Sequence, residues 1–101
     1  MTPKSLAARA RPRVAVERVQ TGLRIEKRLL KVTKALADSL DLSLGDLVEG
    51  VLLHALEGRL PFSPATLARA AQLREVFALD LRAADAHQLT ERPVATARRS
   101  S

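Results

Sequence analysis

The feature that most constrains this chain is one stretch of strict two-residue alternation, residues 18–25 (RVQTGLRI). One face of that stretch carries Val19, Thr21, Leu23 and Ile25, and such a period predicts a β-strand with one buried face. We find no second stretch of this kind in the sequence. A strand without a neighbour leaves its backbone N–H and C=O groups unpaired. We therefore expect this strand to pair with the same strand of a second molecule, as an antiparallel ribbon with two-fold symmetry.

The rest of the chain predicts helices. Leucine and alanine contribute 18 and 17 of the 101 residues, and both are strong helix formers. The two phenylalanines are the only aromatic residues, a composition that disfavours β-sandwiches and small barrels. Apolar residues at helical spacing predict helices over 26–40, 44–57 and 63–79, with a short turn or helix around 82–89.

The predicted ends of these helices rest on capping residues. Ser43, with Asp46 three positions later, has the spacing of a helix N-cap. Ser63 followed by Pro64 is a second N-terminal signal, because proline favours the first helical position. Gly58 is the expected stop of the second helix.

Positive charge is concentrated in the first third of the chain. Residues 1–31 carry a net charge of +7, residues 32–60 carry −3 and residues 61–101 carry +2. This asymmetry favours a polyanionic partner, above all nucleic acid. The chain has no cysteine, which excludes disulfides and zinc-thiolate sites, and no apolar run approaches the roughly 20 residues of a membrane span. We expect a cytoplasmic protein associated with the nucleoid.

The order of one basic strand, two amphipathic helices and a capped serine between them resembles the ribbon-helix-helix family of DNA-binding proteins. The resemblance covers about residues 17–58. It is carried by residues 20–25, the helix from Glu26, the turn over 41–43, and the apolar positions Leu44, Val48, Leu52 and Leu56. It implies a mainly α fold in which one strand pairs across an intertwined homodimer, with a C-terminal helical extension. Around the domain at 17–58 we expect a flexible basic arm (1–16), a helical extension (59–90) and a disordered tail (91–101).

The resemblance also implies the roles of individual residues. Base edges in the major groove would be read by Arg18, Gln20, Gly22 and Arg24. Phosphates would be contacted by Lys27, Arg28, Ser43 and Leu44. The dimer core would consist of Leu23, Ile25, Leu29, Val32, Leu36, Leu44, Val48, Leu52 and Leu56.

The function implied is a sequence-specific transcriptional regulator, most readily a repressor, that binds double-stranded DNA as a dimer or a dimer of dimers. The alternative is an antitoxin whose C-terminal segment, within residues 59–101, binds a toxin protein. We expect no enzyme, because the chain has no glycine-rich phosphate loop and no cluster of histidines with carboxylates. No cofactor, metal or membrane partner is expected.

Overall fold

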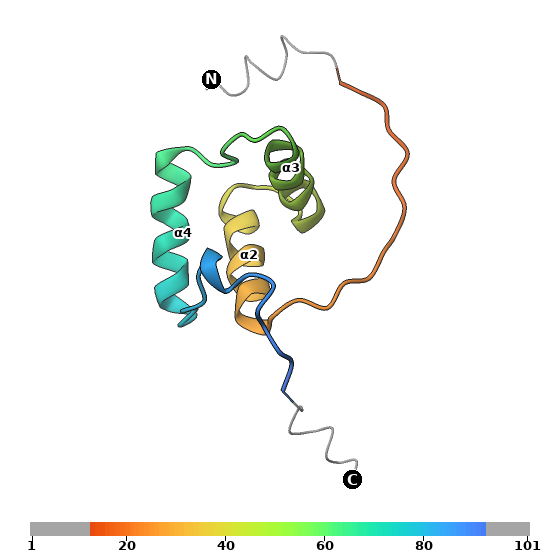
Figure 1. Ribbon diagram of the computed structural model, residues 1–101. Helices are drawn as coiled ribbons and strands as arrows, with labels where there is room; N and C mark the ends of the chain where they lie inside the picture. The colour runs from red at the N-terminus through yellow and green to blue at the C-terminus, as the bar shows by residue number, and fades with distance from the viewer. Residues whose placement is uncertain (1–12, 93–101) are drawn as a thin grey trace.

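The computed structural model describes residues 13–92, and three α-helices make up most of this part of the chain. They are α2 (Lys27–Ser39), α3 (Leu44–Leu56) and α4 (Pro64–Val76), followed by the short 3-10 helix η1 (Ala83–Asp85). Residues 13–26 precede α2 and run in a wide arc outside the helices (Figure 1). Residues 1–12 of the predicted arm and 93–101 of the predicted tail lie outside the described residues.

The predicted helices are confirmed, each ending one to three residues earlier than expected. Ser43 caps α3 and Ser63 caps α4, each accepting a hydrogen bond from the backbone N–H three residues later, at 3.1 and 3.2 Å. Gly58 follows the end of α3 with a φ of 74°, the left-handed conformation that glycine adopts without strain. Asp41, in the turn between α2 and α3, has a φ of 59°. Aspartate tolerates this conformation better than most residues do.

The hydrophobic core lies along α2, which sits between α3 and α4 and packs against both (Figure 1). Its buried centre is formed by Leu36 and Ala37 of α2 and Leu47 of α3. Partly buried apolar side chains surround this centre: Leu40, Leu42, Val51, Phe62, Ala70 and Leu73. The last three lie beyond residue 59, so the C-terminal extension is part of the same core as the helix pair.

The prediction of a ribbon-helix-helix fold is wrong. That fold requires a β-ribbon, and the described residues 13–92 contain helices and no strand. The alternating stretch at 18–25 is irregular and exposed, because this part of the chain offers no second strand with which its backbone can pair. The observed fold is a small all-helical unit preceded by an extended segment. No helix within residues 13–92 has both the length and the apolar character to cross a membrane.

Candidate nucleic-acid interface

The extended segment, residues 13–25, is exposed at every position. No backbone hydrogen bond joins it to another described residue, so the N–H and C=O groups along its length face solvent. Large apolar side chains are exposed as well, with Val19 at 83% and Leu23 at 73%. The exposed apolar side chains make this segment a candidate contact surface.

Arg18 of the extended segment reaches the N-terminal half of α3. Its Nε and Nη2 donate hydrogen bonds to Glu49 Oε2 and Oε1 at 2.7 and 2.9 Å. Asp46 Oδ1 lies 3.8 Å from the same Nη2. Hydrogen bonding to Glu49 raises the pKa of Arg18 above its ordinary value, and the same contact lowers the pKa of Glu49. The predicted base reader Arg18 is therefore paired with carboxylates of its own chain.

Arg24 forms a second ion pair, with Glu91 near the end of the described residues. Its Nε lies 3.2 Å from Glu91 Oε1, and its Nη2 donates to Glu91 Oε2. Both side chains are exposed, at 80% and 58%. Hydrogen bonding to Arg24 lowers the pKa of Glu91. A pair this accessible to solvent exchanges readily for another anion.

Arg28 anchors the start of α2 to the segment that follows α4. Its Nη1 donates to the Ala78 carbonyl at 2.9 Å and to Asp80 Oδ1 at 3.0 Å, and its Nε donates to Glu26 at 3.1 Å. Desolvation raises the pKa of Glu26, but hydrogen bonds from the Leu29 N–H and the Arg28 guanidinium outweigh it and hold that pKa below its ordinary value. These contacts give Arg28 a structural role within the fold.

The predicted phosphate site at Ser43 and Leu44 carries negative charge. The Ser43 hydroxyl accepts the Asp46 N–H at 3.1 Å, and the carboxylates of Asp46 and Glu49 lie in the first turns of α3. A helix N-terminus attracts anions, but here carboxylates of the helix already meet its positive end. The remaining predicted contacts, Gln20, Gly22 and Lys27, are exposed.

The predicted dimer-core residues fall into three groups by exposure. Val32 and Leu36 are buried within the single chain, at 6% and 4% exposure. Leu44 and Val48 are half-buried. The other five are exposed between 42% and 84%: Leu23, Ile25, Leu29, Leu52 and Leu56. The single chain therefore leaves much of its apolar surface uncovered.

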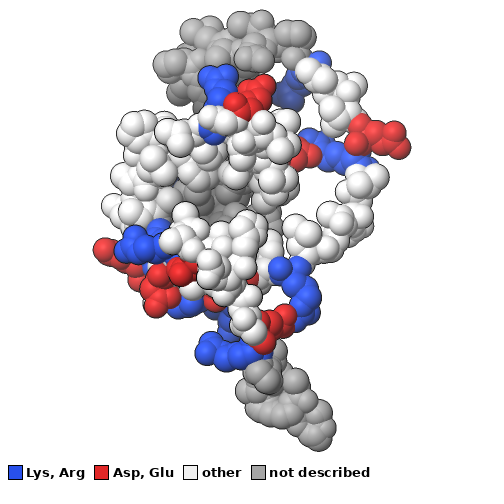
Figure 2. Space-filling model, viewed as in Figure 1, with Lys and Arg blue, Asp and Glu red and all other residues white. Residues whose placement is uncertain are grey.

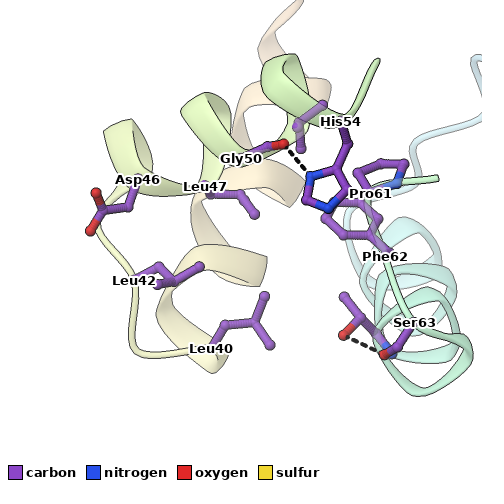
Figure 3. Close-up of a pocket in the computed structure, with 11 residues that line it drawn as sticks. Leu40, Leu42, Asp46, Leu47, Gly50, His54, Pro61, Phe62 and Ser63 are labelled. Carbon is purple, nitrogen blue, oxygen red and sulfur yellow. Dashed lines mark hydrogen bonds between the residues drawn. The ribbon is translucent and has the colours of Figure 1, made fainter. Parts of the chain in front are cut away.

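One apolar cavity of about 170 Å³ opens between α3 and the start of α4 (Figure 3). Leu40, Leu42 and Leu47 line one side, and the His54 ring lies beside Pro61 and Phe62 on the other. His54 Nδ1 hydrogen-bonds to the Gly50 carbonyl at 2.7 Å. Within residues 13–92, no group of three or more metal-ligating side chains comes together.

Sequence reasoning missed the acidic partners of the interface, Glu49 and Glu91. They lie 31 and 67 positions from the arginines they bind, and no local pattern signals pairs so distant. Figure 2 shows the consequence, because most blue side chains on this face lie next to red ones, with an uncharged area between α3 and α4. Comparisons with protein-family models, curated proteins and solved structures find no match for this chain.

Proposed function

We propose that this protein is a DNA-binding transcriptional regulator that acts as a homodimer and contacts duplex DNA through residues 13–34. One observation carries the proposal: an extended segment, exposed along its whole length and without backbone partners, leads directly into a basic helix. Its exposed apolar side chains, such as Val19 and Leu23, favour a partner that covers them, because burial of apolar surface is favourable.

The charge of this region supports a polyanionic partner. Residues 13–34 contain seven basic and two acidic side chains. Arg18, Arg24 and Arg28 are paired with carboxylates of the chain, whereas the other four basic side chains have no described carboxylate within 4 Å. A surface with this excess of positive charge attracts a polyanion over a distance of about 10 Å at moderate salt. Duplex DNA is such a polyanion, with one negative charge per about 1.7 Å of helix axis.

Side-chain chemistry supports sequence-specific binding. An arginine guanidinium donates two parallel hydrogen bonds to guanine O6 and N7, and a glutamine amide pairs with adenine N6 and N7. Arg18, Gln20 and Arg24 supply these groups at intervals of two and four residues along an exposed backbone. The carboxylates of Glu49 and Glu91 hold the two guanidinium groups until DNA replaces them. We propose that the bound protein acts as a repressor by blocking access to a promoter.

A second copy of the chain is the partner that best covers the apolar surface. Leu52 and Leu56 lie four residues apart on the outer face of α3 and are 54% and 84% exposed. Leu23 and Ile25 add to the uncovered apolar surface at the end of the extended segment. Within residues 13–92 five apolar residues are buried, which makes a thin core, and association with an identical chain is a common way to enlarge one.

The toxin-binding alternative draws less support from the contacts. It needs the C-terminal segment to be free to bind a partner, whereas Leu73 of α4 packs against the core and Leu79 is 6% exposed. The same segment binds Arg28 through Ala78 and Asp80. We therefore propose the regulator alone.

The proposal is tested by incubating the full-length protein with sheared genomic DNA at physiological salt and sequencing the bound fragments. We expect recovered fragments to share a short motif, inverted or in tandem. A variant with Arg18→Gln and Arg24→Gln should lose that enrichment. A matched variant with Arg59→Gln and Arg82→Gln removes the same charge elsewhere and should keep it. If wild-type protein retains no DNA, the proposal fails and the search moves to a protein partner.

A further inference from the structure

The arginines and lysines of this protein differ in how their charges are used. Six of the nine arginines within residues 13–92 bind a carboxylate or a carbonyl of the same chain: Arg18, Arg24, Arg28, Arg59, Arg69 and Arg74. The three lysines of that region, Lys27, Lys31 and Lys34, are exposed, and none lies within 4 Å of a described carboxylate oxygen. These three lysines therefore carry positive charge that no described carboxylate neutralises.

These lysines form one row on α2. Positions 27, 31 and 34 are spaced by four and three residues, which places them on the same face of a helix. At 1.5 Å per residue the row is about 10 Å long. The core residues Val32 and Leu36 lie on the opposite side of α2. The row therefore faces solvent while the other side of the helix holds the core.

Glu26 caps α2 and accepts the Leu29 N–H at 2.8 Å, so a carboxylate already meets the positive end of this helix. The first turn contains Lys27 and Arg28 and no acidic residue, and the last turn contains Asp38 and no basic residue. Because the N-terminal end of a helix is positive, cations are disfavoured there and anions are favoured. In contrast, α3 follows the stabilising order, with Asp46 in its first turn and His54 in its last. The Glu26 cap serves the stability of α2, whereas the lysines near its N-terminal end add nothing to that stability and leave their charge available to an anionic partner.

We infer that this lysine row (Lys27, Lys31 and Lys34) is a docking surface for the phosphate backbone of duplex DNA. Each strand of a duplex presents one phosphate per 3.4 Å of axis, so a row of about 10 Å matches roughly three of them. The row begins three residues after Arg24, which places phosphate contacts next to the proposed base contacts. This inference rests on the proposed function, to which it adds a surface and a role.

An anionic membrane is the competing partner for a basic helix. A helix that binds a membrane surface buries an apolar face in the lipid. The apolar face of α2 is occupied, because Leu36 and Ala37 are 4% and 2% exposed within the core. The row therefore fits a partner that is recognised by charge alone, such as a phosphate backbone.

The salt dependence of DNA binding tests the inference. Each phosphate contact contributes about 0.9 to the slope of log affinity against log salt. The double variant Lys31→Gln with Lys34→Gln should lower that slope by about two per protomer, since glutamine keeps the helix but removes the charge. Raising the salt fourfold should then cost the variant about tenfold less affinity than it costs the wild type. Circular dichroism checks that the helices remain.

The matched control is the double variant Arg59→Gln with Arg82→Gln, which removes two charges from outside α2 and should keep the wild-type slope. Equal salt slopes for the wild type and the lysine variant would contradict phosphate binding by the row, while the proposal of DNA binding would still stand. An equal decrease in the control would also contradict phosphate binding by the row, because the effect would then come from net charge. If the wild-type protein binds no duplex DNA, the proposed function itself is contradicted. If the lysine variant loses binding to vesicles of mixed phosphatidylserine and phosphatidylcholine but binds DNA as the wild type does, the row would be assigned to lipid instead.

Discussion

Arg24 and Glu91 lie 67 positions apart in the chain, and their side chains form a two-point ion pair on the surface of the folded protein. The pair joins the extended segment to the stretch that follows η1. Its arginine is one of the proposed base-reading groups, so the carboxylate of Glu91 occupies the atoms with which DNA would bond. Any anion that binds Arg24 must first displace this carboxylate.

Removing that competitor should strengthen DNA binding. We expect Glu91→Gln to raise affinity for duplex DNA by up to about fivefold, the range of an exposed ion pair. Equilibrium titration of a labelled duplex measures the change. The control is Glu75→Gln on α4, which removes one negative charge from an exposed position without a described ion pair. Equal gains for both variants would mean that net charge is responsible and that Glu91 does not mask Arg24.

The ion pair between Arg18 and Glu49 predicts a dependence of stability on pH. Hydrogen bonding to Arg18 lowers the pKa of Glu49 from its ordinary value of 4.5. A carboxyl group with a lowered folded-state pKa stabilises the fold above pH 4.5, and this contribution is lost as the pH falls through the folded-state value. We expect the urea concentration at the unfolding midpoint to fall as the pH is lowered below 4.5. This decrease should be less steep for Glu49→Gln than for the wild type. A variant with the same pH profile as the wild type would show that the pair adds nothing to stability.

The core predicts that truncation of a buried leucine and truncation of an exposed leucine change the free energy of unfolding by very different amounts. Leu36 is 4% exposed at the centre of the core, and Leu53 is 66% exposed on α3. Leu36→Ala should lower the free energy of unfolding by about 2–5 kcal/mol, because it removes buried methyl groups and leaves a cavity. Leu53→Ala should change it by no more than about 0.5 kcal/mol. Urea denaturation of both variants checks the contrast, and equal losses would contradict the assigned core.

The proposed homodimer predicts that a charge on the outer face of α3 separates the two chains. Leu56 is 84% exposed in the single chain and belongs to the stripe that we expect a second copy to cover. Leu56→Lys should therefore yield a monomer by sedimentation equilibrium, whereas Val76→Lys on α4, at a side chain that is 72% exposed and outside that stripe, should leave the dimer intact. Wild-type protein that sediments as a monomer at high concentration would rule out this surface as a dimer interface.

The helices could be predicted from the sequence because their signals are local. Ser43 and Ser63 cap their helices as predicted, and Gly58 takes the left-handed conformation just after α3. Apolar spacing also found the buried face of α2, where Val32 and Leu36 are both buried. Each of these features depends on residues within a few positions of one another, so a single sequence contains the information.

The irregular conformation of residues 18–25 and the ion pairs could not be predicted in the same way. Alternation over residues 18–25 indicates which side chains share a face, but strand formation needs a neighbouring backbone, which residues 13–92 do not supply. The acidic partners of Arg18 and Arg24 come from α3 and from the stretch after η1, and only the packing of the helices brings them close. The roles predicted for the exposed residues 18–24 stay predictions.

The central claim is that Arg24 reads a base within a preferred DNA sequence. The most direct measurement compares the affinities of wild-type protein and Arg24→Ala for the duplex recovered from genomic DNA and for a scrambled duplex of equal length. We predict that Arg24→Ala loses about tenfold or more on the recovered duplex and much less on the scrambled one. Equal losses on the two duplexes would contradict the claim, because Arg24 would then contribute charge alone.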